Sequence, residues 1–270
     1  MHNICIICNE NDASFFKGIS SNPKVSSIEF FIDTNAPQSI SEKRENSQEQ
    51  FDIVLLHAGE KNFEYATESI KTGLHLLLTN SYNLPANEIN YLRQLSIEMG
   101  VHVLFSGLAN TPVNLSYPFT IPFIANLTRT VSVKGTNREF LINLIRFDLT
   151  SLALLCPYEI RKIRVYELPL CSSTPSKVMV LIDFNNNSAS TYHLNLNPTN
   201  SAQLTVDVES QQFQEEVSIY NPANQFQLSK DTDMLISSIE TGKEPLLGFQ
   251  LAGKSFQILD AITKKLGWEN

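Results

Sequence analysis

The sequence lacks several features that would place the chain in a membrane or outside the cell. Its 270 residues contain no apolar run of the roughly 20 residues that a membrane-spanning helix needs. Met1 leads directly into an apolar run typical of a core strand rather than into a signal sequence. We therefore expect a cytoplasmic protein.

Basic residues are fewer than acidic residues in this chain. The chain has 20 Lys and Arg residues against 28 Asp and Glu residues, and the basic residues form no block beyond short pairs. Such a surface repels phosphate backbones and anionic lipids. We expect neither nucleic acid nor a membrane surface as a partner.

Cysteine is scarce, with four residues in the chain. Cys5 and Cys8 lie three positions apart in a predicted strand, so their side chains point to opposite faces. A thioredoxin-like redox pair is therefore not expected, and we interpret these residues as buried thiols.

The clearest pattern lies between residues 51 and 107, where short apolar runs alternate with stretches of helical periodicity. The apolar runs cover residues 53–56, 74–78 and 101–105. The second helical stretch ends at Gly100, where a left-handed cap is easiest. Continuous apolar strands that alternate with helices predict a parallel sheet buried on both faces. With the apolar run Asn3–Cys8, this pattern predicts an α/β, Rossmann-like N-terminal domain.

This series of elements resembles the Gfo/Idh/MocA oxidoreductases, NAD(P)-dependent enzymes that act mostly on sugars and polyols. The resemblance rests on Gly73–Leu78, on the helix that follows, and on the Gly-Val-His-Val sequence at 100–103. It is strengthened by the Thr-Gly-Lys-Glu-Pro-Leu turn at 241–246 and the amphipathic stretch after it. The chain is shorter than the usual member of that family.

The resemblance implies a dinucleotide site after the first strand, but the loop departs from the family pattern. The three glycines of the fingerprint would fall at Cys8, Glu10 and Ala13. Glu10 puts a carboxylate where two phosphate charges would be held, and two like charges about 4 Å apart repel by roughly 4 kcal/mol at an effective dielectric near 20. We therefore expect no cofactor, and NAD or NADP only if the family activity survives. The alternative is that Glu10 faces water at a helix N-terminus and favours the helix dipole.

Two further positions belong to the implied cofactor site. Asp33 follows the predicted second strand, where the fingerprint uses an acid to bind the ribose hydroxyls, although Asp before a turn also has local reasons. His57 ends a predicted strand at the edge where ligands bind in open α/β sheets. A partly buried structural histidine is the other interpretation of His57.

The catalytic Lys of the family is missing. Family members carry Glu-Lys-Pro after the strand that here ends at Leu78, and the matching residues are Thr79, Asn80 and Ser81. Asn80 stands at the Lys position and is not expected to catalyse.

A long predicted helix at 137–155 resembles the family helix that carries His-x-x-Asp. Asp148 falls on its apolar stripe, and Asp148 and Ser151 share the spacing of three, but the His is absent. A carboxylate on an apolar face should be paired or have a raised pKa, which makes Asp148 the site candidate of the second domain. The alternative is a structural carboxylate bonded to a neighbouring Arg or to backbone amides.

We place the domain boundary near residue 115, in a Pro- and Gly-rich stretch, which gives domains of 1–115 and 116–270. The second is predicted to be an α+β domain whose strands between 161 and 220 form an open antiparallel sheet. In the resembled family the outer face of this sheet makes the homodimer. A small-molecule ligand in the cleft between the domains is a further expectation.

The sequence thus predicts a degenerate family member that has lost NAD(P)-dependent catalysis and acts as a dimeric binding or scaffold protein. The alternative is an active NAD(P)-dependent oxidoreductase on a sugar or polyol. A different reaction that uses Asp148, His57 or Tyr82 is a third hypothesis, for which no converging motif is present.

Overall fold

The computed structural model divides the chain into two units that differ from the predicted domains. It describes residues 1–8, 16, 18–32, 39–46, 50–58, 61–79, 84–106, 122–132, 138–156, 158–169, 175–197, 203–210, 214–219, 226–245 and 247–268. Unit 1 comprises Met1–Ala109 and Asn224–Gly253, and unit 2 comprises Asn110–Ala223 and Lys254–Asn270. The predicted division at residue 115 left the whole C-terminal part in the second domain. The segment 224–253 groups with unit 1 instead, because its helix α5 (Phe226–Thr241) packs on the unit 1 sheet.

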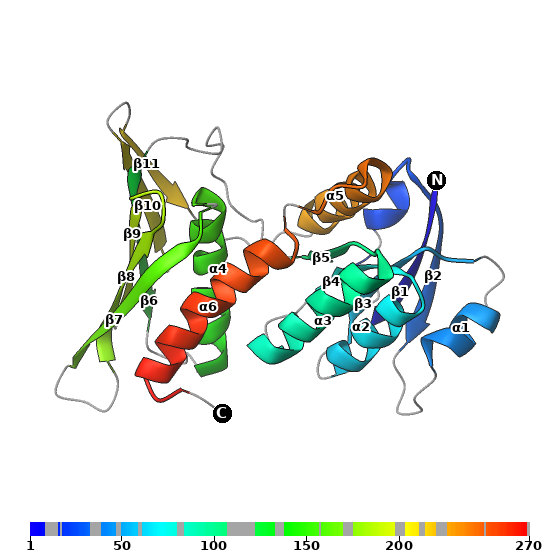
Figure 1. Ribbon diagram of the computed structural model, residues 1–270, viewed down its shortest axis with the longest axis horizontal. Helices are drawn as coiled ribbons and strands as arrows, with labels where there is room; N and C mark the ends of the chain where they lie inside the picture. The colour runs from blue at the N-terminus through cyan, green and yellow to red at the C-terminus, as the bar shows by residue number, and fades with distance from the viewer. Residues whose placement is uncertain are drawn as a thin grey trace. The chain divides into compact units, whose positions relative to one another are not determined.

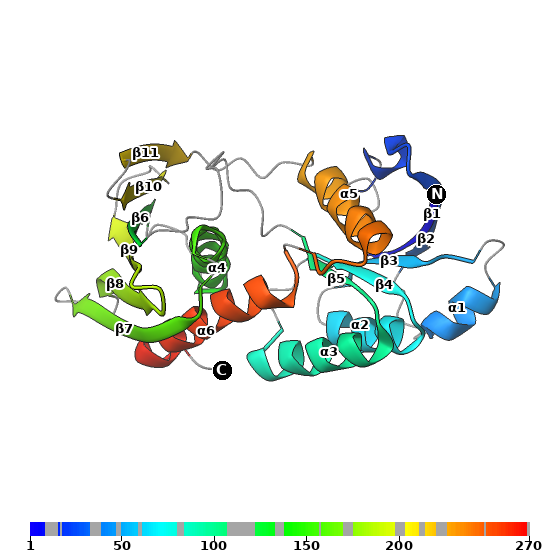
Figure 2. The same cartoon turned by 45° about the horizontal axis from the view of Figure 1, so that its top comes forward.

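In its described residues, unit 1 has a parallel sheet of five strands in the order β2-β1-β3-β4-β5. Its strands are β1 (His2–Cys8), β2 (Val25–Ile32), β3 (Ile53–His57), β4 (His75–Leu78) and β5 (Val103–Phe105). Its other helices are α1 (Ile40–Asn46), α2 (Asn62–Lys71) and α3 (Ala86–Met99). Helices α2 and α3 cover one face of the sheet and α5 covers the other (Figures 1 and 2). This arrangement confirms the Rossmann-like prediction.

The apolar runs become the strands for the expected reason. Residues Ile4–Cys8, Ile53–Leu56 and Leu76–Leu78 are all buried, as continuous apolar strands between two helical layers must be. The edge strand β2 begins with Val25, Ser26 and Ser27, and these two serines make the apolar signal weak in its first half. Helix α3 ends at Gly100 in the left-handed conformation with φ of 66°, which confirms the predicted cap.

The part of unit 2 that the structure describes contains a sheet of six strands in the order β11-β10-β6-β9-β8-β7. The strands are β6 (Phe123–Ser132), β7 (Ile160–Pro169), β8 (Pro175–Phe184), β9 (Ala189–Asn197), β10 (Gln203–Ser210) and β11 (Gln214–Ile219). The sequence predicted an open antiparallel sheet, whereas β6 pairs with β9 in parallel and the other pairs are antiparallel. The sheet is therefore mixed. Alternation along a strand identifies its buried face but not its neighbour, so the insertion of β6 between β9 and β10 could not be foreseen.

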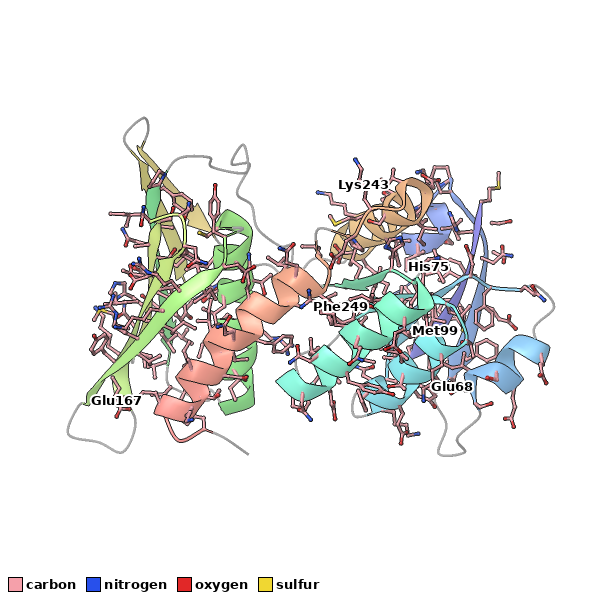
Figure 3. All side chains as sticks on the ribbon, viewed as in Figure 1. Glu68, His75, Met99, Glu167, Lys243 and Phe249 are labelled. Carbon is pink, nitrogen blue, oxygen red and sulfur yellow. The ribbon has the colours of Figure 1, made fainter. Side chains whose placement is uncertain are left out.

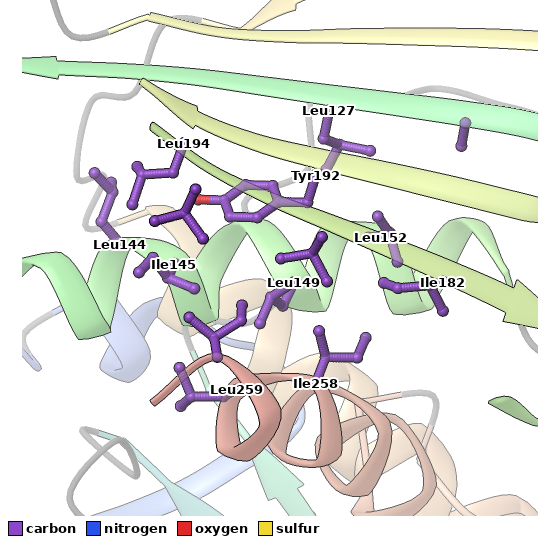
Figure 4. Packing of buried hydrophobic residues seen from close by; sticks show 14 of the residues in the cluster. Leu127, Leu144, Ile145, Leu149, Leu152, Ile182, Tyr192, Leu194, Ile258 and Leu259 are labelled. Atoms are coloured by element: carbon purple, nitrogen blue, oxygen red, sulfur yellow. The ribbon is translucent and has the colours of Figure 1, made fainter. Parts of the chain in front are cut away.

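The core of unit 2 lies between this sheet and the helices α4 (Arg138–Leu155) and α6 (Phe249–Lys265). Figure 4 shows Leu144, Ile145, Leu149 and Leu152 of α4 between the sheet and Ile258 and Leu259 of α6. Full burial of each such side chain is worth about 1.5–3 kcal/mol. Leu127 of β6 is the register partner of Tyr192 of β9, which places both on the face that α4 covers. This core fixes the relation of α4 to β6 and β9.

Candidate functional site

The sheet of unit 1 has a topological switch point between β1 and β3. These strands end side by side at Cys8 and His57, which are register partners. Strand β2 lies on the far side of β1, and β4 lies on the far side of β3, so the strand order reverses here. In open α/β sheets, ligands bind outside the carboxyl ends of the strands at such a point. This edge is the candidate site, and the predicted position of His57 at a strand end is confirmed.

His57 is held in place by Thr79 and Phe16. Its Nδ1 lies 2.6 Å from Oγ1 of Thr79, and that hydroxyl donates to the carbonyl oxygen of Leu56 at 2.8 Å. Because a hydroxyl has one proton to donate, Nδ1 of His57 must carry the proton of the shared hydrogen bond. The ring of Phe16 meets the imidazole edge-on at 5.7 Å between ring centroids. The orientation and the Nδ1–H form of His57 are therefore set by its surroundings.

Asn62 ties the loop after β3 to the loop after β4. Its side-chain oxygen accepts from the backbone N–H of Ala58 at 2.8 Å, and its amide donates to the carbonyl oxygen of Thr79 at 3.2 Å. Asn62 is completely buried. Since a buried amide must be hydrogen-bonded, these contacts fix the two loops relative to each other. Sequence reasoning gave Asn62 no role, and its polar side chain at the start of a helix beside a buried strand was the available signal.

The last strand of the sheet is joined to α5 at the same edge. The hydroxyl of Ser106 donates to Oδ2 of Asp231 at 2.6 Å, and the backbone N–H of Ser106 donates to Leu78 at 2.8 Å. Asp231 is fully buried. These bonds position the end of β5 under α5.

Three of the other predicted site positions, Glu10, Asp33 and Asn80, lie outside the described residues. The expected repulsion between Glu10 and a diphosphate therefore stays a prediction. Cys8 is described, and both it and Cys5 are fully buried, which confirms their interpretation as buried thiols.

Asp148 lies in the interior of unit 2, where it meets two residues of the sheet. Arg129 of β6 forms a two-pronged ion pair with it, through Nε at 2.9 Å from Oδ2 and through Nη2 to Oδ1. The hydroxyl of Tyr192 on β9 donates to the same Oδ2 at 2.9 Å. All three residues have no exposed surface. These contacts match the alternative interpretation of Asp148 from its sequence, a structural carboxylate bonded to a neighbouring arginine.

The charges of this cluster balance within it. Burial lowers the pKa of Arg129, but the hydrogen bonds and charge of Asp148 outweigh that effect and the net shift is upward. Burial raises the pKa of the Asp148 carboxyl, while Arg129 and Tyr192 oppose the rise. The three donors that converge on Asp148 fit an ionised carboxylate, which only accepts hydrogen bonds. Asp148 therefore serves to pair α4 with the sheet.

Sequence reasoning found Asp148 but missed its partners. The signal for Arg129 was present, because Phe123, Ala125, Leu127 and Val131 alternate with solvent-facing residues and put Arg129 on the buried face. A buried arginine requires an acid beside it. Tyr192 gave no such signal, since a tyrosine in a strand is common.

In the described part of the chain, no group of three or more His, Cys, Asp or Glu residues is arranged to hold a metal ion. None of the helices in the same residues is long and apolar enough to cross a bilayer.

Solved structures match this chain over nearly its whole length. UDP-N-acetylglucosamine 3-dehydrogenase GnnA from Acidithiobacillus ferrooxidans is 12% identical, with a TM-score of 0.70 over 97% of this chain and 97% of that chain. GenD2 from gentamicin A biosynthesis, solved in complex with NAD, is 10% identical, with a TM-score of 0.69 over 98% and 94%. Scyllo-inositol dehydrogenase from Lactobacillus casei, solved with NAD(H) and scyllo-inositol, is 8% identical, with a TM-score of 0.69 over 98% and 96%.

Neither a protein-family profile nor a curated protein matches the sequence. At identities of 8–12% the structural matches establish the fold and leave the activity open. Because the matches include both units, the fold assignment covers the chain as a whole. The chain has the fold of the Gfo/Idh/MocA-type dehydrogenases, at low sequence identity to them.

Proposed function

We propose that this protein keeps the dehydrogenase fold without NAD(P)-dependent catalysis and acts as a dimeric binding or scaffold protein. Oxidation of a secondary alcohol by hydride transfer requires a held nicotinamide, a group that takes the hydroxyl proton and a group that polarises the carbonyl. The proposal is that this set of groups has been lost. Fold alone does not supply them.

The observation that carries the proposal is the enclosure of Asp148. This carboxylate lies on the helix that resembles the catalytic helix of the family. Its Oδ1 accepts a hydrogen bond from Arg129, and its Oδ2 accepts from Arg129 and Tyr192. Three residues earlier, at the spacing of the family His, stands the buried Ile145. Ile145 has no group that exchanges a proton, and the enclosure of Asp148 supports the proposal that it takes none from a substrate. General acid–base catalysis is typically worth roughly 100- to 10,000-fold, so its loss would leave little turnover.

Two substitutions in the sequence support the same proposal. Asn80 stands in place of the family Lys, and an amide exchanges no proton near neutral pH. Glu10 stands in place of the second glycine, with Asp12 two residues later. Carboxylates there disfavour a bound diphosphate.

The ligand we expect at the carboxyl edge of β1 and β3 is a small polar molecule without a diphosphate. His57, Thr79 and Asn62 form a hydrogen-bonded group at this edge, in the place where open α/β sheets bind ligands. The side chains of His57 and Thr79 hold each other, and the side chain of Asn62 is held by backbone groups of Ala58 and Thr79. This lowers the entropic cost of arranging the group for a ligand.

The test is a titration with cofactor. We expect NAD, NADH, NADP and NADPH at millimolar concentration to leave the melting temperature unchanged, and a panel of sugars and polyols to give no cofactor reduction. A working site would raise stability by about 2.7 kcal/mol at 100 times the dissociation constant, a shift of several degrees. A dehydrogenase with an intact glycine-rich loop serves as the positive control.

Two variants separate the loop charge from other causes of lost binding. Glu10→Gln removes the carboxylate, and Glu98→Gln removes an exposed carboxylate of α3. If the charge of Glu10 is the obstacle, the first variant gains cofactor affinity by tenfold or more and the second does not.

The alternative is an active NAD(P)-dependent oxidoreductase on a sugar or polyol. It is favoured by the fold, since similar structures were solved with NAD or with NAD(H) and scyllo-inositol. Reduction of cofactor by the purified protein with any alcohol of the panel would establish this alternative and end our proposal.

A further inference from the structure

The amino edge of the unit 1 sheet, opposite the candidate site, gathers three of the five histidines of the chain. His2 begins β1, His75 begins β4, and His102 directly precedes β5. Asp52 directly precedes β3, and its Oδ2 lies 2.5 Å from Nδ1 of His2, while its Oδ1 accepts from the backbone N–H of Asn3 at 2.9 Å. These four side chains, the histidine row, stand at the starts of four adjacent strands.

The row is joined by backbone hydrogen bonds as well. The N–H of His75 donates to the carbonyl oxygen of Asp52 at 3.0 Å, and the N–H of Leu76 donates to that of His102 at 2.9 Å. Each member is therefore linked to its neighbour in the order of the strands. His75 is labelled in Figure 3 at the start of β4.

The link between His75 and His102 depends on protonation. The two imidazoles stack at 5.5 Å between centroids with 15° between their planes, and the backbone N–H of His102 donates to Nδ1 of His75 at 3.0 Å. A nitrogen that accepts a hydrogen bond carries no proton, so His75 is neutral in this arrangement. A proton on Nδ1 would remove this bond and would place a positive charge against the neighbouring ring.

The charged groups around the histidine row only partly offset the positive charge that a protonated His75 would carry. Asp52 favours a charged His75, whereas His102 and His2 oppose it, and Glu244 favours a charged His102. Farther out, Glu240 pairs with Lys24 at 2.6 Å and interacts with His2. Burial, and then His102, lower the pKa of His75 to about 4, and burial also lowers the pKa of His102.

We propose that the histidine row is an acid-sensitive clasp, which joins the starts of β3, β4 and β5 while His75 is neutral and opens locally when His75 is protonated. The folded state depresses the pKa of His75 below its ordinary value of 6.5. The open state then binds the proton more tightly, so the stability of the clasp is complete above the ordinary pKa and is lost as the pH falls toward about 4.

Hydrogen exchange on the whole protein tests the clasp. Between about pH 7 and about pH 5, protection of the Leu76 and His102 amides is expected to fall roughly tenfold more than that of the β1 amides, after correction for intrinsic exchange rates. In His75→Asn the side-chain oxygen can accept the same N–H and does not titrate, so this extra loss should disappear. His193→Asn, which changes a histidine of β9 in unit 2, should behave like the parent protein.

Parallel loss of protection in the parent and His75→Asn proteins, or no extra loss in the parent, would overturn the proposal. Should His75→Asn fail to fold, an NMR titration of the parent protein decides. The His75 ring and the His102 amide should then titrate together with a pKa of about 4. A His75 pKa at or above its ordinary value, or a His102 amide that does not follow the ring, would also overturn it.

Discussion

Arg129 and Asp148 form an ion pair with no exposed surface, which joins a strand of the unit 2 sheet to helix α4. The two residues are 19 positions apart, and two hydrogen bonds in a forked geometry connect them. Removing charges from water is costly, so such a pair is stable only when both partners are present and hydrogen-bonded. With Tyr192, Arg129 supplies the hydrogen-bond partners that a buried carboxylate needs.

Asp148→Asn should destabilise the protein strongly, because it leaves the buried guanidinium of Arg129 without its counter-charge. We expect a loss of about 3–5 kcal/mol in the free energy of unfolding, measured by urea denaturation. The matched control is Asp183→Asn, because the side chain of its partner Arg164 is 40% exposed. This substitution should lower the free energy of unfolding by about 1 kcal/mol or less. Equal losses in the two variants would contradict this assignment.

Tyr192→Phe removes one hydrogen bond to Asp148 and leaves the ion pair in place. We expect a smaller loss of about 1 kcal/mol in the same urea experiment. Asp148 keeps two bonds from Arg129, so no charge becomes uncompensated. A loss as large as that of Asp148→Asn would mean that the tyrosine, rather than the arginine, determines the stability of the cluster.

Asn62→Ala should loosen the candidate site. The change leaves the buried N–H of Ala58 and the carbonyl oxygen of Thr79 without the side chain that bonds them. We expect a loss of about 1–3 kcal/mol in the free energy of unfolding. Asn90→Ala, on the exposed side of α3, is the control and should change stability by about 0.5 kcal/mol or less. Similar values for both variants would contradict the bridging role of Asn62.

The open face of the unit 2 sheet is the surface on which we expect the homodimer. Ile124 of β6 and Tyr166 of β7 are 49% and 44% exposed there. Ile124→Asp should shift the mass measured by light scattering from twice 30.4 kDa to 30.4 kDa, because a charge buried in an interface is costly. Ile97→Asp, on α3 with 71% exposure, should leave the dimer intact. A monomeric parent protein, or equal effects of both variants, would refute this interface.

The buried thiols should be unreactive in the folded protein. Cys5, Cys8 and Cys156 have no exposed surface, and burial raises the pKa of Cys156 to about 12. Because the thiolate is the reactive form, a thiol reagent at about pH 8 should label none of the three within minutes in a Cys171→Ser variant. Full denaturation should expose all three. Rapid labelling of the folded variant would show that one of them is accessible.

The sequence by itself determined which segments become strands and helices in unit 1. The apolar runs after residue 50, the helical spacing between them and the cap at Gly100 are local properties. The strands begin and end within two residues of the predicted runs, and the cap lies at the predicted residue. The same local patterns placed His57 at the end of its strand. The resemblance to a dehydrogenase fold rested on this order of elements.

The tertiary structure decided what each side chain meets. The parallel pairing of β6 with β9, the packing of α5 on the unit 1 sheet and the bonds of Asp148 to Arg129 and Tyr192 all join segments far apart in the chain. A periodic pattern tells only which face of an element is buried. Whether a buried carboxylate is catalytic or structural depends on the groups that other strands bring to it, and only the assembled fold supplies those groups.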